Sequence, residues 1–119
     1  MAIEILLVED NALVAVSLSR LLQSAGYACT RVANAELAIE YLTRTMPRLI
    51  ISDLALPGIN GVALLKRVRA DSRTAALPFI IYSASCDMEN TEVFRQAGAT
   101  ACCSKYKPEE LLRLIANAC

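Results

Sequence analysis

Short apolar runs alternate along the chain with segments whose apolar residues recur at helical spacing. The run at 3–8 reads Ile-Glu-Ile-Leu-Leu-Val. Such a β-branched, nearly all-apolar stretch is typical of a strand covered on both faces. Three similar runs follow, and a weaker one lies near the end of the chain. The pattern therefore predicts five buried strands, at residues 3–8, 28–32, 49–51, 78–82 and 99–103.

A helical pattern follows each predicted strand. Asn34 is placed to cap the second helix and Pro108 to begin the fifth, while Gly26 and Gly98 are placed to end the first and fourth. The apolar residues at helical spacing are Leu13, Val14, Val16, Leu18, Leu21 and Leu22; Leu37, Ala38, Tyr41 and Leu42; Val62, Leu65 and Val68; Met88, Val93, Phe94 and Ala97; and Leu111, Leu112 and Ile115.

Five successive β-α units predict an α/β fold, in which right-handed crossovers place helices on both faces of a parallel sheet. No linker, repeat or low-complexity stretch interrupts the pattern. We therefore expect one domain over residues 1–119, with no output domain in this chain.

Composition narrows the class of protein. Hydrophobic residues make up 55% of the 119 residues, which excludes a disordered chain. Twelve basic residues balance twelve acidic ones, and this neutrality argues against direct binding to nucleic acid or an anionic membrane. No apolar run is long enough for a membrane span, and the N-terminus lacks the basic start of a secretory signal. We expect a cytoplasmic protein.

The chain has five cysteines and no histidine. The cysteine spacing contains no Cys-x-x-Cys pair, so we expect reduced, mostly buried thiols and neither a disulfide nor a zinc site. Cys102 and Cys103 are adjacent in a predicted strand and should point to opposite faces, which prevents an easy disulfide between them. Histidine-based catalytic triads are excluded.

Polar residues directly follow four of the predicted strands: Glu9 and Asp10 the first, Asp53 the third, Ser83 the fourth and Lys105 the fifth. Ligands of open α/β sheets bind at this edge. Carboxylates about 4 Å apart repel by on the order of 4 kcal/mol at an effective dielectric of 20, so a proton or a cation is needed there. Oxygen donors favour Mg²⁺.

With a cation present, Asp53 could attack a phosphoryl donor, while Lys105 and Ser83 neutralise or hydrogen-bond the phosphoryl oxygens. Each residue taken singly also has a structural interpretation. Asp10 could cap the first helix, Ser83 could belong to a turn, and Lys105 could be a solvated surface residue. The joint pattern favours the functional interpretation.

Four segments resemble the receiver domain of two-component response regulators, and the resemblance covers essentially the whole chain. It implies a flavodoxin-like (βα)5 three-layer sandwich with strand order 2-1-3-4-5. The segments are residues 5–11, with the acidic pair; 50–61, around the aspartate; 77–84, with the hydroxyl residue; and 98–105, with the lysine.

The resemblance also implies a role for each site residue. Asp53 is expected to be the phosphoacceptor, with Mg²⁺ (or Mn²⁺) ligated by Asp53, Asp10 and the backbone carbonyl of Ala55, and by Glu9 largely through water. Ser83 and Lys105 would bind the phosphoryl group. The donor would be a phosphohistidine on a sensor histidine kinase or a phosphotransfer domain, and an unidentified downstream protein would respond.

Two positions depart from the family pattern. Cys102 stands where the family usually carries a Tyr or Phe that swings inward on phosphorylation, so we expect an atypical readout through contacts near residues 83–89, or onward transfer of the phosphoryl group. Lys105 is followed by Tyr106 instead of a cis proline, so we expect a trans peptide or a distorted loop there. Tyr106 could replace the missing ring or could be a surface residue.

Two other functions stay open. The fold could serve as an interaction module that no longer depends on phosphorylation, as Cys102 and Tyr106 suggest. A phosphohydrolase that uses Asp53 as nucleophile is disfavoured, because the aspartate phosphatases place a general acid where this chain has Ala55. We therefore expect no turnover of a separate substrate.

Overall fold

The apolar runs form a single parallel sheet in the computed structural model, which describes residues 3–84, 86 and 88–119, with residues 88–90 described by their backbone. The strand order is β2-β1-β3-β4-β5, which confirms the predicted fold class. The strands are β1 (Glu4–Val8), β2 (Ala28–Val32), β3 (Leu49–Ser52), β4 (Phe79–Ser83) and β5 (Ala101–Ser104).

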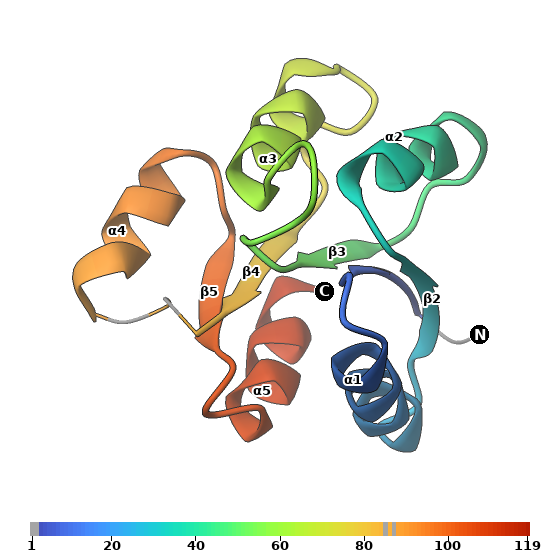
Figure 1. Cartoon of the computed structure of the whole chain (residues 1–119), viewed down its shortest axis with the longest axis vertical. Coiled ribbons are helices and arrows are strands. Elements are labelled where there is room, and N and C mark those ends of the chain that lie inside the picture. The colour runs from blue at the N-terminus through green and yellow to red at the C-terminus, as the bar shows by residue number, and fades with distance from the viewer. Residues whose placement is uncertain (1–2, 85, 87) are drawn as a thin grey trace.

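Helices cover both faces of this sheet. Helices α1 and α5 lie on one face, and α2, α3 and α4 lie on the other (Figure 1). The helices are α1 (Ala12–Ser24), α2 (Ala35–Arg44), α3 (Gly61–Ala70), α4 (Met88–Gln96) and α5 (Glu109–Ala118).

A hydrophobic core lies on each face of the sheet, which explains why the central strands β1, β3 and β4 are almost entirely apolar, whereas the edge strand β2 is partly exposed. Alternate residues of β1 and β3, such as Leu6 and Ile50, pack under α2, α3 and α4, whereas Leu7 and Ile51 pack under α1 and α5. Every one of these side chains is almost fully buried. Because side chains alternate across a strand, a sheet covered on both faces needs apolar residues at nearly every strand position.

Local signals set several helix boundaries as predicted. Asn34 Oδ1 accepts from the Leu37 N–H at 2.8 Å and so caps α2. Gly26 follows α1 with a φ of 92°, a conformation that favours glycine. Asn11, and not Asp10, caps α1, which leaves the Asp10 carboxylate available at the sheet edge.

The strand boundaries differ from the prediction mainly at β5. The strand begins at Ala101 instead of residue 99. Just before it, the Thr100 N–H donates to the Phe79 carbonyl at 2.8 Å, and the Thr100 hydroxyl oxygen accepts from the Phe79 N–H at 3.0 Å. No peptide bond of the described residues is cis, which confirms the trans prediction at Lys105–Tyr106. Within the described part of the chain, no helix is long and apolar enough to span a membrane.

Candidate functional site

Three carboxylates converge at the carboxyl edge of the sheet. Val8 pairs with Ser52 at the ends of β1 and β3, so the residues that follow these strands are neighbours. The Asp53 N–H donates to the Val8 carbonyl at 3.0 Å. One carboxylate oxygen each from Glu9, Asp10 and Asp53 lies within 4.8 Å of the other two. The clustering predicted from the strand ends is therefore present.

Lys105 brings a positive charge to this cluster from the end of β5. Its Nζ lies 2.8 Å from Asp53 Oδ2 and 3.0 Å from Glu9 Oε1. Burial acts to lower the pKa of Lys105, but the hydrogen bond to Asp53 and the charges of both carboxylates outweigh it, so the pKa lies above its ordinary value. Lys105 therefore stays protonated and forms ion pairs with the two buried carboxylates.

Glu9 is the more deeply buried member of the acidic pair, with 1% of its surface exposed. Its Oε2 accepts from the Asn11 N–H at 3.2 Å. Its Oε1 is buried at ion-pair distance from Lys105 but has no partner with the geometry of a hydrogen bond. Burial raises the pKa of Glu9, and the Lys105 and Asn11 contacts only partly oppose it.

Asp53 has its two carboxylate oxygens in different surroundings. Oδ1 accepts from the Leu54 N–H at 2.7 Å and from the Ala55 N–H at 3.4 Å, whereas Oδ2 accepts from Lys105. Only 7% of the residue is exposed. The cluster thus offers oxygen donors of the kind that a hard divalent cation prefers, with a buried oxygen of Glu9 that lacks a good donor.

Two residues that the sequence did not single out hold this loop in place. Arg31 on β2 donates from Nε to the Glu9 carbonyl at 2.8 Å and from Nη2 to the Asp10 carbonyl at 3.1 Å, so it fixes the backbone of the acidic pair. Gly61 begins α3 so close to the site that a Cβ there would lie 2.2 Å from the Asp53 carbonyl oxygen. Neither contact has a local signal in the sequence.

Comparison with known proteins assigns the family. Residues 5–116 match the model of the response regulator receiver domain. The chain belongs to this family. It is 31% identical over 109 residues to the phosphate regulon transcriptional regulatory protein PhoB of Pseudomonas aeruginosa, a match that covers 91% of this chain and 48% of PhoB. The chain spans about half the length of curated relatives such as PhoB.

Solved receiver domains share the whole fold. The chemotaxis response regulator CheY4 of Vibrio cholerae superposes with a TM-score of 0.90 at 26% identity, over 100% of both chains. The receiver domain of the sensor histidine kinase PA1611 of Pseudomonas aeruginosa PAO1 superposes with a TM-score of 0.87 at 30% identity, over 98% of this chain and 97% of that one. That structure has a magnesium ion coordinated in the active-site cleft. Receiver domains act in two-component signalling as phosphoacceptors for histidine kinases.

Ser83 ends β4 at the same edge of this receiver domain and is 5% exposed. Its backbone carbonyl accepts from the Lys105 N–H at 3.1 Å and from the Cys86 N–H at 3.2 Å. The predicted hydroxyl residue and the predicted lysine are therefore joined through their backbones. Ala55, whose backbone carbonyl was expected to be a metal ligand, lies two residues after Asp53 in the same loop.

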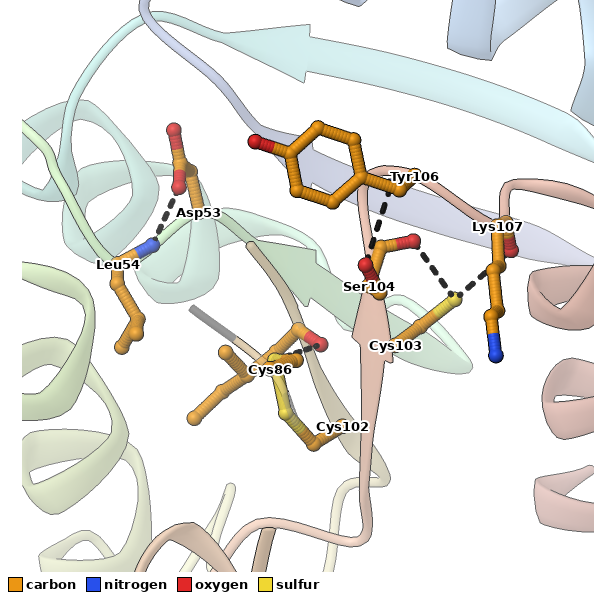
Figure 2. The surroundings of a disulfide bond; sticks show 9 residues. Asp53, Leu54, Cys86, Cys102, Cys103, Ser104, Tyr106 and Lys107 are labelled. Carbon is orange, nitrogen blue, oxygen red and sulfur yellow. Dashed lines mark hydrogen bonds between the residues drawn. A yellow bond between two sulfur atoms is a disulfide. The ribbon is translucent and has the colours of Figure 1, made fainter. Parts of the chain in front are cut away.

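The prediction that all five cysteines are thiols is wrong. Cys86 and Cys102 form a disulfide with an S–S distance of 1.99 Å and a Cα–Cα distance of 5.9 Å, and the bond lies beside β5 (Figure 2). Because the two bonded cysteines are 16 residues apart, no local spacing in the sequence marks them as a pair. The pairing of Ile81 with Cys102 and the turn after Ser83 bring them together.

Cys29, Cys103 and Cys119 are free thiols, as predicted, but only Cys103 is buried, whereas Cys29 is partly buried and Cys119 is exposed. Cys102 packs against the core under α2, α3 and α4, while Cys103 belongs to the core under α1 and α5. Figure 2 shows the Cys103 sulfur on the other side of β5 from the disulfide. The two adjacent cysteines therefore point to opposite faces, as predicted.

Tyr106 does not fill the space of the missing aromatic residue. It is 80% exposed, and its backbone N–H donates to Ser104 Oγ at 3.1 Å. Of the two interpretations of Tyr106, the surface residue is the one that this structure shows. The segment at residues 83–89, where the readout was expected, is only partly described by the structure, because residues 85 and 87 fall outside the described residues.

Proposed function

We propose that this receiver domain accepts a phosphoryl group on Asp53 from a phosphohistidine of a sensor histidine kinase or a phosphotransfer domain, in the cytoplasm. The observation that carries the proposal is the position of the Asp53 carboxylate, which is buried at the sheet edge between the acidic pair and the Lys105 ammonium. Family membership over residues 5–116 supports the same chemistry.

The transfer requires one bond to form and one to break. A carboxylate oxygen of Asp53 attacks phosphorus, the P–N bond of the phosphohistidine breaks, and its electron pair stays on the imidazole nitrogen. The Lys105 ammonium and the Ser83 hydroxyl bind oxygens of the transferred group. Lys105 is already at 2.8 Å from Asp53, so little rearrangement is needed to bring its charge to the phosphoryl group.

The acidic cluster fits Mg²⁺ or Mn²⁺. Asp10, Asp53 and the Ala55 carbonyl would ligate the ion, and Glu9 would hold it largely through water. The fit rests on the donor set, because three carboxylates face a single ammonium and a buried Glu9 oxygen lacks a good hydrogen-bond donor. When bound, the cation neutralises negative charge on the phosphoryl oxygens.

The readout is proposed to be atypical because Cys102 replaces the aromatic residue that the family usually carries. A cysteine side chain is too small to make the inward swing of a ring, and it is bonded to Cys86. Tyr106 is too exposed to substitute for that ring. A downstream protein would then respond to the segment after Ser83. We expect no direct contact with nucleic acid and no turnover of a separate substrate.

Labelling with phosphoramidate and Mg²⁺ tests this function, because this small donor contains the same P–N bond as phosphohistidine. We expect one phosphoryl group per chain, located on Asp53 by peptide mapping, and no label when the metal is chelated before the donor is added. Asp53→Asn should abolish the label, while Asp71→Asn, the same change on the exposed C-cap of α3, should leave it intact.

Two outcomes would contradict the proposal. A label that persists in Asp53→Asn would place the phosphoacceptor elsewhere, and no label at all would favour the phosphorylation-independent interaction module. Continuous release of phosphate from a small phosphomonoester, well beyond one equivalent, would instead favour the phosphohydrolase, although Ala55 cannot serve as its general acid.

A further inference from the structure

The Cys86–Cys102 disulfide joins the turn after Ser83 to the middle of β5. Both cysteines line a surface depression of about 530 Å³, together with Tyr106 and Lys107. Cys102 is half-buried, whereas Cys86 is 7% exposed. The bond therefore lies at the surface of the domain and can be reached from solvent through the Cys102 side.

We propose that Cys86 and Cys102 are a redox-active pair, a modification site whose conversion between dithiol and disulfide controls the turn after Ser83. The effect on signalling rests on the proposed function of Asp53. The redox chemistry itself does not, and it can be tested without phosphorylation.

Reversible bonding is favoured over a permanent structural bond. In the cytoplasm, the compartment proposed above, protein disulfides are usually transient and serve catalysis or redox sensing. The reduced Cys86 thiol would also have a hydrogen-bond acceptor, because Cys86 Sγ lies 3.6 Å from the Ile81 carbonyl oxygen.

Cys103 provides an internal contrast. It is almost fully buried on the opposite side of β5, and burial raises the pKa of its thiol to about 11. Because the thiolate is the reactive form, this cysteine should stay inert under conditions that oxidise or reduce its neighbour. Adjacent cysteines in β5 thus differ in access to the solvent.

The chemistry balances with a small disulfide as the oxidant. The Cys102 thiolate attacks one sulfur of the small disulfide and releases a thiolate, which leaves a mixed disulfide on Cys102. The Cys86 thiolate then attacks the Cys102 sulfur and releases the second thiolate. The two protons of the cysteine thiols pass to the two released thiolates. The protein loses two electrons, and the small disulfide gains them.

The Cys86–Cys102 disulfide limits the movement of the segment next to Ser83 and Lys105, the two residues proposed to bind the phosphoryl group. The Ser83 carbonyl accepts from both Cys86 N–H and Lys105 N–H, so the turn and the lysine share one anchor. With the disulfide formed, Cys86 can move only together with β5. A phosphoryl group on Asp53 would be bound by the Lys105 ammonium, which lies 2.8 Å from Oδ2, and by the Ser83 hydroxyl, and the cross-link would oppose any shift of Ser83 toward that group. The coupling is reciprocal: if the disulfide lowers the equilibrium constant for phosphorylation by some factor, phosphorylation shifts the dithiol–disulfide equilibrium toward the dithiol by the same factor.

The first experiment measures the redox site alone, in a Cys119→Ser background that removes the exposed terminal thiol. The folded protein is equilibrated in mixtures of reduced and oxidised glutathione, and the thiols are then alkylated and mapped. We expect Cys86 and Cys102 to convert together between dithiol and disulfide while Cys103 stays unlabelled. Cys29→Ser, which removes a thiol outside the pair, should leave the conversion unchanged.

Single variants identify the order of attack. Cys86→Ser should trap glutathione on Cys102, and Cys102→Ser should form the adduct on Cys86 more slowly because that sulfur is more buried. A pair that stays reduced at every glutathione ratio would overturn the proposal. A disulfide that is reduced only after unfolding would also overturn it, because the bond would then be a permanent structural link.

The second experiment tests the coupling to Asp53. The glutathione ratio at half-oxidation is measured in Mg²⁺ with and without phosphoramidate. Labelled protein should require a mixture more oxidising by about 5-fold or more, at the low end of common coupling strengths. Asp53→Asn should show no shift. An unshifted midpoint in fully labelled protein would refute control of the turn, whereas absence of label with normal cycling would refute the proposed function and leave the redox site standing.

Discussion

The two halves of the sheet hold their functional loops by different means. Around β1 and β3, the loops are held by the Arg31 guanidinium and by the close approach of Gly61 to the Asp53 carbonyl. Around β4 and β5, the turn after Ser83 is held by a disulfide to Cys102. Non-covalent contacts persist in any redox environment, but a disulfide can be broken without unfolding the domain. On the two proposals made above, the phosphoacceptor site would stay the same in any redox environment, whereas the response to phosphorylation would depend on the state of the disulfide.

The largest effect is expected from Gly61→Ala, which tests how tightly the β1–β3 half is packed. The new Cβ would lie 2.2 Å from Asp53 O and 2.9 Å from Leu54 Cα, both backbone atoms that cannot turn aside. We expect the free energy of unfolding to fall by about 2–4 kcal/mol in urea titrations, because the backbone of the site must shift.

Gly26→Ala is the matched control for this change. Its Cβ would meet nothing within 4 Å, but the φ of 92° disfavours alanine. The expected loss is roughly 1 kcal/mol from backbone conformation alone. If Gly61→Ala costs no more than Gly26→Ala, the loop is not fixed by that close approach.

An intermediate effect is expected from the buried thiol of Cys103 in the β4–β5 half. Burial, with the charges of Glu110 and Glu109, raises its pKa from 9.0 to about 11. Below about pH 9 the thiol is protonated in both states. Between about pH 9 and 11 the unfolded chain loses this proton and the folded chain keeps it, so stability falls as the pH rises, by on the order of 2 kcal/mol in total.

Urea unfolding of the protein and of Cys103→Ala across this pH range isolates the effect, because Tyr82, Lys105 and other groups titrate in both proteins. The variant should lose stability less steeply with pH. Identical slopes would mean that the Cys103 thiol ionises as easily in the folded domain as in the unfolded chain.

The smallest effect is expected from Tyr106→Ala. The ring is exposed, and the hydrogen bond of this residue to Ser104 uses the backbone N–H, which alanine keeps. The free energy of unfolding should change by less than about 0.5 kcal/mol, and labelling of Asp53 should proceed at the same rate. A marked loss of stability would mean that Tyr106 does replace the missing internal ring.

Much of the fold was predictable because its signals are local. The strands were predicted to within about two residues at each end, since a sheet covered on both faces requires unbroken apolar runs. The carboxylate cluster was predictable for a related reason. Parallel strands all end at one edge, and the strand order that the family resemblance implies makes β1 and β3 neighbours, so Glu9, Asp10 and Asp53 were expected to lie together.

The sequence alone determined the parallel α/β fold, the clustering of three carboxylates with Lys105, and the opposite orientation of Cys102 and Cys103. The fold and the orientation of the cysteines follow from residue order and the periodicity of a strand, and the clustering follows once the strand order implied by the family resemblance is added. Only the tertiary structure decided that Cys86 bonds Cys102, that Arg31 holds the acidic pair and that Gly61 touches Asp53. Those contacts join segments far apart in the chain, and their geometry depends on strand register and on the path of each turn, which hydrophobic periodicity does not encode.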